Sequence, residues 1–408
     1  MKPILIIGGG ISGVTAALEL AEAGKQVILV EKSPYLGGNV AKMHNYFPKL
    51  CPPACGLEIN YRRIKSNPRI KVYTRSELIH IEGKQGDMKA TLRHQPEMIK
   101  DTCTVCGECV AVCPEDRPDI FNACHGVTKA IYQPQPLAFP QKYDIDPSYC
   151  KGEQCGKCVE LCAYDAIDLS AEEEEERIDV HSLIVATGWK SYDPEKISEL
   201  SYGISKDILT NLEFERLLSV TGPFEGKLIR PSDKAVPGSI AFVQCAGSRD
   251  RNHLSYCSAV CCSASLKHAL NAVEALPGAK ATIYYIDLRV SGRNEDFLKR
   301  AEQHERIELV KGKVARITVS KESAQLKLEA EHILESRKIE KEFDMIVLAT
   351  GIVPEKNTIE LKMNAEGFHS SLQDEGIYPV ACSKKPMDVS TSVKEATAAA
   401  LKAMAINE

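Results

Sequence analysis

A glycine-rich turn near the N-terminus, Gly8-Gly9-Gly10-Ile11-Ser12-Gly13, constrains the fold of this chain more than any other feature. It follows the apolar run Pro3–Ile7 and precedes a helix-like stretch, Val14–Ala23. A second apolar run, Gln26–Val30, ends at Glu31. This order is typical of a dinucleotide-binding βαβ unit, in which a pyrophosphate lies at the helix N-terminus and an acidic residue binds the ribose. A glycine-rich turn without a ligand is the alternative. The candidate binding residues are Gly8, Gly10, Ser12, Gly13, Glu31 and Lys32.

Two later segments favour FAD over NAD as the nucleotide. Ser182–Gly188 and Asp344–Gly351 are near-duplicates, each an apolar strand ending in Ala-Thr-Gly. This repeat resembles the glycine-ended strands of the thioredoxin reductase-like flavoproteins, where the chain leaves and re-enters the FAD domain. The predicted fold is therefore α/β, with two dinucleotide domains of that kind. Further candidate FAD residues are Gly37, Gly38, Asn39, Thr187, Gly188 and Gly351.

The C-terminal region departs from the thioredoxin reductase-like pattern. Gly376–Cys382 stands where these enzymes carry Gly-Asp, whose aspartate binds the ribityl chain. Asp388, or the backbone of Ser390–Val393 at a helix N-terminus, would substitute for it. Cys382 is better explained as a small buried apolar residue than as a redox group.

Two cysteine runs interrupt the flavoprotein pattern, CTVCGECVAVCP from Cys103 and CKGEQCGKCVELC from Cys150. Such runs hold [4Fe–4S] clusters in bacterial ferredoxins, and the fourth cysteine of each run ligates the other cluster. A zinc site needs only two Cys-x-x-Cys pairs and is disfavoured. The second run is irregular, with four residues before Cys155 and Ala163 where proline is common. The predicted ligand sets are Cys103, Cys106, Cys109 and Cys162 for one cluster, and Cys150, Cys155, Cys158 and Cys113 for the other.

A second dinucleotide-like unit has lost its phosphate-binding turn. We expect a strand over Ser239–Gln244, a helix over Ser258–Ala275 and a strand over Ala281–Asp287, but the turn reads Cys245-Ala-Gly-Ser-Arg-Asp. NAD(P) binding is therefore not expected there. Four cysteines gather instead and would suit a third [4Fe–4S] cluster, although two ligands with two bystanders is the alternative. They are Cys245, Cys257, Cys261 and Cys262.

Composition agrees with a redox protein of a reducing compartment. The chain has 16 cysteines and begins at once with a strand pattern, so we expect a cytoplasmic protein whose thiols serve metals. No apolar run approaches the ~20 residues of a membrane span. A net charge of −5, with both signs spread along the chain, argues against nucleic acid as a partner.

Several motifs together resemble the A subunit of heterodisulfide reductases. They are GGGISG, the element Phe47–Cys55, the cysteine-rich insert, RPSD at Arg230–Asp233, QCAGSRD at Gln244–Asp250 and YCSAVCC at Tyr256–Cys262. The resemblance covers nearly the whole chain, and in length it is nearest to the A subunit of the quinone-interacting membrane-bound oxidoreductase of sulfate reducers. It implies FAD, three [4Fe–4S] clusters, and Lys267 as a catalytic residue close to the flavin N5. Without the resemblance, a helical lysine is most simply a solvated one.

The resemblance also implies a function within a complex. We expect an electron-transfer subunit that links a membrane quinone-reactive partner to a cytoplasmic one in sulfur metabolism, held peripherally at the inner face of the membrane by partner subunits. The alternatives are a soluble electron-bifurcating heterodisulfide reductase subunit and a cluster scaffold without catalysis. Cys51 and Cys55, on a stiff loop around Pro52 and Pro53, could form a redox dithiol, support a shared cluster, or be inert.

The expected organisation places an insert and a second domain within the FAD domain. The FAD domain comprises residues 1–100, 166–195 and 341–408, the ferredoxin-like insert 101–165, and the second Rossmann-like domain 196–340. One helix is expected near Leu212–Leu218, and Glu172–Glu176 is expected to form a solvated hairpin turn or an acidic docking patch.

Overall fold

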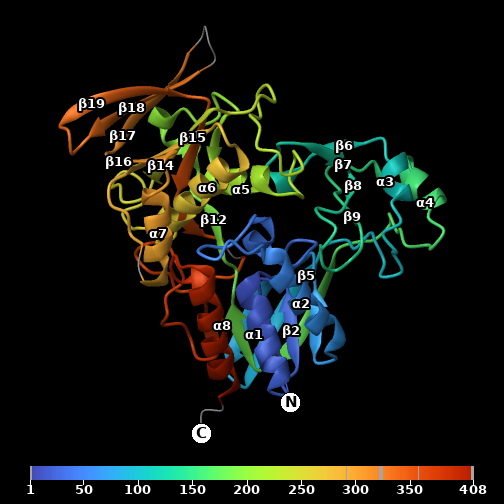
Figure 1. Ribbon diagram of the computed structural model, residues 1–408. Helices are drawn as coiled ribbons and strands as arrows, with labels where there is room; N and C mark the ends of the chain where they lie inside the picture. The colour runs from blue at the N-terminus through green and yellow to red at the C-terminus, as the bar shows by residue number, and fades with distance from the viewer. Residues whose placement is uncertain (1, 291, 321–324, 357, 406–408) are drawn as a thin grey trace. The chain divides into compact units, whose positions relative to one another are not determined.

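The computed structural model describes residues 2–290, 292–320, 325–356 and 358–405, and its chain divides into two compact units (Figure 1). The first unit comprises Met1–Ala41, Ala54–Trp189 and Pro354–Glu408, and the second comprises Lys42–Pro53 and Lys190–Val353. The chain returns to the first unit at Pro354 rather than at the expected 341. The difference arises because strand β20 (Met345–Thr350) is hydrogen-bonded into the sheet of the second unit.

The first unit is built on a parallel sheet in the order β22-β11-β1-β2-β3. Leu5 and Ile7 of β1 pack with Met88 and Leu92 of a second, antiparallel sheet, β10-β5-β4, and helix α1 packs against α8. Both faces of the central strands are thus covered, so their side chains are uniformly apolar. The elements are β1 (Ile4–Ile7), α1 (Ile11–Glu22), β2 (Val27–Val30), α2 (Pro53–Ser66), β3 (Ile70–Tyr73), β4 (Ser76–Lys84), β5 (Asp87–His94), β10 (Glu174–Val180), β11 (Ser182–Val185), β22 (Ile377–Pro379) and α8 (Val389–Met404).

The cysteine-rich segment forms an insert between β5 and β10 (Figure 1). An antiparallel bridge between Ile99 and Ile167 joins its two ends. These two residues form a small core with Ile131 and Ile145, and six of the cysteines pack against it. The elements are α3 (Glu108–Val112), β6 (Asp116–Pro118), β7 (Val127–Lys129), β8 (Ile131–Tyr132), β9 (Asp144–Ile145) and α4 (Lys157–Glu160).

The second unit repeats the same architecture. Its parallel sheet has the order β13-β20-β14-β15-β16, with Phe242 of β14 packed against helices α5 and α6. An antiparallel sheet, β17-β18-β19, covers the other face. The elements are β13 (Ile208–Thr210), α5 (Asn211–Leu218), β14 (Ser239–Ala246), α6 (Cys261–Ala275), β15 (Lys280–Tyr285), α7 (Glu295–Glu302), β16 (Ile307–Lys311), β17 (Val314–Val319), β18 (Leu326–His332) and β19 (Arg337–Phe343). Short strands β12 (Trp189–Ser191) and β21 (Ile352–Pro354) lie at the unit boundaries in the sequence.

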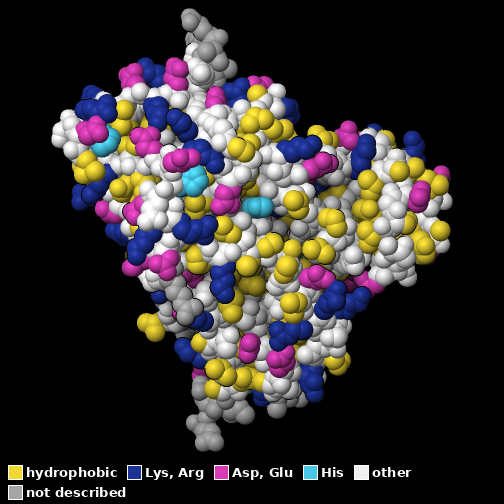
Figure 2. All heavy atoms as spheres, viewed as in Figure 1, with side chains coloured by type: hydrophobic (Ala, Val, Ile, Leu, Met, Phe, Trp, Pro, Cys, Tyr) yellow, Lys and Arg dark blue, Asp and Glu magenta, His cyan; other side chains and the backbone are white. Residues whose placement is uncertain are grey.

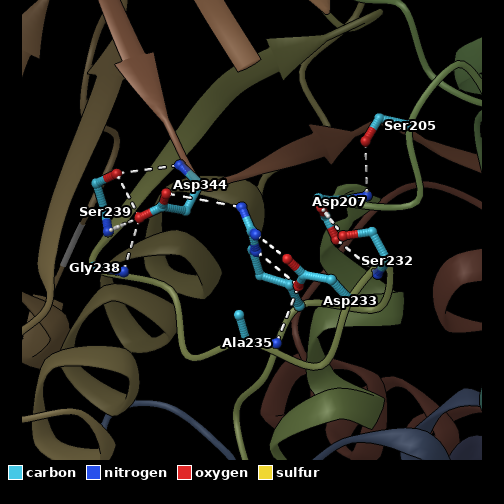
Figure 3. A network of polar contacts seen from close by, with 9 residues as sticks. Ser205, Asp207, Ser232, Asp233, Ala235, Gly238, Ser239 and Asp344 are labelled. Carbon is cyan, nitrogen blue, oxygen red and sulfur yellow. Dashed lines mark hydrogen bonds and ion pairs between the residues drawn. The ribbon is translucent and has the colours of Figure 1, made fainter. Parts of the chain in front are cut away.

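The RPSD motif fixes the N-terminal ends of two strands in this second sheet (Figure 3). The carboxylate of Asp344, just before β20, accepts hydrogen bonds from the backbone N–H of Gly238 (2.8 Å) and Ser239 (2.9 Å) at the start of β14. Arg230 pairs with both Asp233 and Asp344. The hydroxyl of Ser232 donates to Asp207 at 2.5 Å. This motif is therefore explained by the fold, without a ligand.

Three local expectations are corrected. Glu174–Glu176 lie in β10 rather than in a turn, because Arg93 pairs with the neighbouring carboxylates Glu173 and Glu175 and Tyr73 donates to Glu176 at 2.7 Å. Cys55 lies in the first turn of α2, since proline is tolerated at the first helical positions. Helix α6 begins at Cys261 rather than Ser258, whose hydroxyl accepts the N–H of Ile352.

Charged side chains of both signs are interspersed over the face shown in Figure 2. Within the described ranges, no helix has the length and hydropathy needed to cross a bilayer.

Candidate redox site

The glycine turn between β1 and α1 has the close approaches that a pyrophosphate loop needs. A Cβ at Gly13 would lie 1.8 Å from the carbonyl oxygen of Gly8. Gly8 itself has φ +101° and lies against the backbone of Ala186. Gly10 is the N-cap of α1, and no side chain caps the first N–H groups of the helix there. Such a terminus is suited to an anionic phosphate.

Glu31 lies at the end of β2 and contacts this loop directly. Its carboxylate accepts hydrogen bonds from the N–H of Gly9 (2.5 Å) and of Ser33 (2.8 Å). Burial raises the pKa of Glu31, and these two N–H donors oppose that effect. A carboxylate can accept about four hydrogen bonds, so Glu31 retains acceptor capacity for a ribose hydroxyl beyond its bonds with Gly9 and Ser33. The side chain of neighbouring Lys32 is exposed.

Two further predicted segments, Gly37–Asn39 and the one around Thr187, lie in the first unit close to this loop. The N–H of Gly37 donates to the carbonyl of Gly9 at 2.8 Å, and the Cα of Gly10 would lie 3.1 Å from a Cβ at Gly38. The side chain of Asn39 donates to the carbonyl of Trp189 at 2.6 Å. Thr187 follows Ala186, and its buried hydroxyl has no hydrogen-bond partner in the described part of the chain. An orphaned buried hydroxyl beside a glycine cradle fits a cofactor that supplies the missing partner.

The remaining predicted FAD residues have other structural roles. The side chain of Asp388 caps helix α8 by accepting the N–H of Thr391 at 2.6 Å, and Val393 lies in the first two turns of that helix. Gly188 has φ +73°, which favours glycine. Gly351 belongs to the second unit, where a Cβ would clash with Leu254 and with the hydroxyl of Ser248. Cys382 is buried, as expected of a packed thiol.

The insert cysteines lie close to one another both within and between the two runs. Burial and the neighbouring thiols of Cys103 and Cys106 raise the pKa of Cys109 to about 12. Burial and the thiols of Cys150 and Cys113 likewise raise the pKa of Cys158. A cavity in the insert is lined by Cys113 of the first run together with Cys150, Cys155 and Cys158 of the second. This is the set predicted for one cluster from the ferredoxin spacing.

Backbone donors already point at some of these sulfurs. The N–H of Gly152 lies 3.4 Å from the Cys150 sulfur, and the N–H of Ala166 lies 3.4 Å from the Cys162 sulfur. Such bonds tune cluster potentials in iron–sulfur proteins. Within the described residues, no three ligating side chains converge on the position of one metal ion. The thiolate ligands of a [4Fe–4S] cluster bind at the outer corners of the cube. Thiols arranged around a cavity therefore fit such a cluster better than a single metal ion, whose ligands would converge on one position.

The four cysteines of the second unit gather at the carboxyl end of its sheet. Cys245 has φ +57°, at an irregularity in the pairing of β14 with β20, and Cys261 and Cys262 begin α6. Burial, followed by the thiols of Cys245, Cys262 and Cys257, raises the pKa of Cys261. Arg249 lies beside Cys245 and Cys262, and it pairs with Asp287 at 2.8 Å. A basic side chain among thiols suits a negatively charged centre.

Lys267 is buried, which overturns its simplest interpretation as a solvated helical lysine. Only 2% of the residue is exposed, and its ammonium group forms an ion pair with Glu215 of α5. It also donates to the carbonyl of Asn45 at 2.8 Å, and Nε2 of His268 lies 2.6 Å from the same Glu215 carboxylate. The ammonium group of Lys267 and the hydrogen bond with His268 hold the pKa of Glu215 well below its usual range, although burial opposes them. The sequence offered no local signal for this cluster, because its members come from distant segments.

Comparison with known proteins supports FAD as the nucleotide of the first unit. Residues 3–97 match the family described as FAD dependent oxidoreductase. The A subunit of the H(2):CoB-CoM heterodisulfide,ferredoxin reductase of Methanothermobacter thermautotrophicus is 35% identical, over 98% of this chain and 63% of that protein. The second iron–sulfur A subunit of the CoB–CoM heterodisulfide reductase of Methanopyrus kandleri is 36% identical over the same shares. The chain therefore spans less than two thirds of the length of these curated relatives.

Solved structures support the fold. The thioredoxin reductase of Lactococcus lactis has a TM-score of 0.54 at 14% identity, covering 99% of this chain and 98% of that one. That of T. acidophilum has a TM-score of 0.55 at 12% identity, covering 98% and 97%. The chain thus has a thioredoxin reductase-like fold, and its first part matches the FAD dependent oxidoreductase family. Along nearly its whole length, the chain is a homologue of the A subunits of heterodisulfide reductases, as its motifs indicate.

Proposed function

We propose that this chain is an electron-transfer subunit with one FAD at the β1–α1 loop and three [4Fe–4S] clusters, two in the insert and one at the cysteines of the second unit. When bound, FAD exchanges electrons in pairs and each cluster exchanges one, so such a subunit couples two-electron to one-electron chemistry. The observation that carries the proposal is the cavity lined by Cys113, Cys150, Cys155 and Cys158.

The chain's own residues would bind and orient these groups. The glycine loop and the N-terminus of α1 would hold the pyrophosphate, Glu31 the ribose, and the hydroxyl of Thr187 a polar group of the flavin. Apolar side chains around the insert cysteines would exclude water from the clusters. Lys267 is our proposal, from the family resemblance, for the catalytic residue nearest the flavin N5.

We also propose that the subunit works in a complex, as the names of its relatives describe for them. The partners would include a membrane quinone-reactive subunit that holds the complex at the inner face of the membrane, in sulfur energy metabolism. The name of the Methanothermobacter relative, which includes H(2) and ferredoxin, favours a second candidate, a soluble component of an electron-bifurcating reductase. Mass spectrometry of the affinity-purified native complex separates the two: a quinone-reactive membrane subunit supports the first, and hydrogenase or formate dehydrogenase subunits support the second.

Cofactor content tests the core of the proposal. Anaerobically purified protein should contain about one FAD and, at four irons per cube, about twelve irons with matching sulfide. Stoichiometric zinc in place of iron would overturn the cluster assignment. A flavin that cannot be reduced, with cluster signals unchanged after its removal, would instead favour a scaffold without catalysis.

A further inference from the structure

The insert exposes large apolar side chains directly beside its cysteines. Val159, Leu161 and Tyr164 are 39%, 50% and 50% exposed, and they surround Cys162 in the sequence, immediately after Cys158. We name these three residues the α4 patch. Figure 2 shows hydrophobic side chains gathered on the end of the insert where Figure 1 places α3 and α4. An exposed apolar group of this kind marks an interaction surface.

On balance the unpaired charge around the α4 patch is negative, although α4 itself begins with one exposed basic residue, Lys157. Residues 98–169 hold six basic and eleven acidic side chains, hence a net charge of −5, which is that of the whole chain. Five of the six basic residues are already ion-paired: Lys100, Arg117, Lys129, Lys142 and Lys151. Three exposed carboxylates, Glu108, Glu153 and Glu160, form no ion pair in the part of the chain that the structure describes. Glu108 begins α3 and Glu160 ends α4, and these two helices contact each other.

We propose that the α4 patch is the docking surface for a separate redox protein whose own docking face has an apolar centre and a basic rim. The inference rests on the proposed function, because Cys158 and Cys162 belong to the two predicted ligand sets of the insert. In one encounter a cluster bound in the insert would give up a single electron, and the partner's redox centre would accept that electron. No bond changes and no proton moves. The reverse direction uses the same surface.

The size of the patch indicates a transient partner rather than a permanent subunit. Three exposed side chains are the centre of a small interface, and electron-transfer encounters occupy the low end of interface sizes, below about 1,200 Å². Opposite charges on the two rims would speed association and make it depend on ionic strength.

Binding of ferric cytochrome c tests the surface, since this small basic redox protein exposes an apolar haem edge. The dissociation constant is measured with the full cofactor-loaded chain by titration calorimetry at low ionic strength, without added reductant. We expect Leu161→Ser/Tyr164→Ser to weaken binding at least about tenfold. The matched control is Ile120→Ser/Val127→Ser, which removes apolar side chains that are more exposed (54% and 72%) from the β6–β7 region of the same insert. It should change binding less than about twofold.

A charge variant provides the second arm. Glu108→Gln/Glu160→Gln should weaken binding and flatten its dependence on salt, whereas Glu360→Gln/Glu366→Gln, which alters two exposed carboxylates near the C-terminus, should do neither. Equal binding by both apolar variants, or equal salt dependence of both charge variants, overturns the docking surface. The iron content of each variant is measured in parallel. A wild-type chain without iron refutes the proposed function, and that result is independent of the binding constants.

Discussion

The ammonium group of Lys267 and the carboxylate of Glu215 form an ion pair in the interior of the second unit, with 3% and 6% of their side chains exposed. A buried pair contributes little net stability, because desolvation offsets the attraction, but losing one partner leaves an uncompensated charge. Each of the two residues therefore needs the other to balance its buried charge.

Replacing Glu215 with Gln should lower the free energy of unfolding by about 3–5 kcal/mol, since Lys267 would remain charged and buried. Urea denaturation followed by far-UV circular dichroism measures it. Glu308→Gln is the control, because Glu308 pairs with Lys341 at 2.7 Å with 57% of its side chain exposed. The Glu308→Gln substitution should lower the free energy of unfolding by less than about 1 kcal/mol.

A double variant tests the coupling of the pair. Lys267→Met alone should also destabilise the protein, whereas adding it to Glu215→Gln should recover part of the lost stability. Strict additivity would contradict the pair.

Stability should decrease as the pH falls below about 6.5, the ordinary pKa of histidine. Burial lowers the pKa of His268, and Glu215 with Lys267 already forms a neutral pair, so a protonated His268 would add a net buried charge. The unfolded chain then binds a proton that the folded chain does not, and the slope is up to ~1.4 kcal/mol per pH unit for one group. Burial also lowers the pKa of three other histidines, His44, His181 and His369. Comparing wild type with His268→Gln at pH 7.5 and 5.5 isolates one histidine. Identical slopes would show that His268 is protonated in the folded state.

Gly13→Ala should abolish FAD retention and destabilise the first unit by about 1–3 kcal/mol, the usual cost of overpacking. The added methyl would overlap the carbonyl oxygen of Gly8, 1.8 Å away, and push the loop out of shape. Gly56→Ala is the matched control, because a Cβ there meets nothing within 4 Å. FAD content after gel filtration, read from the flavin absorbance, should fall only for Gly13→Ala.

Cys113→Ser should remove or convert the cluster held mainly by the second cysteine run, although Cys113 lies in the first. Crossed ligation predicts this result, and the cavity shared by Cys113, Cys150, Cys155 and Cys158 supports it. Iron should fall by about a third, and the lost paramagnetic signal should be the one lost in Cys155→Ser. Cys124→Ser, at an exposed cysteine outside both sets, should change neither. If Cys113→Ser instead lost the paramagnetic signal that Cys106→Ser loses, each cysteine run would hold its own cluster without crossing.

The sequence predicted well those elements that its local pattern determines. The glycine turn and its flanking strands were located because apolar runs and glycines act over a few residues, and β1 and β2 differ from expectation by one residue at their starts. Glu174–Glu176 were misjudged because their partners Arg93, Tyr73 and His94 lie in other strands. The environment of Lys267 was missed for the same reason, since Glu215 comes from a different helix and Asn45 from a separate segment. Side-chain pairs between residues far apart in the sequence produce no periodic pattern, so they cannot be predicted from one sequence.

The pairing of His94 with Glu174 has a consequence for the origin of the cysteine-rich segment. These residues are the end of β5 and the start of β10, antiparallel neighbours that a tight reverse turn could connect directly. Residues 95–173 therefore occupy the position of a hairpin loop, and lengthening such a loop costs a host fold little entropy. Deleting residues 95–173 and splicing in a type I′ turn should leave the rest of the first unit able to fold, with Arg75 deprived of its partner Asp144. Conversely, a nucleotide-binding scaffold could gain a one-electron relay in one insertion event, with no change to its sheet.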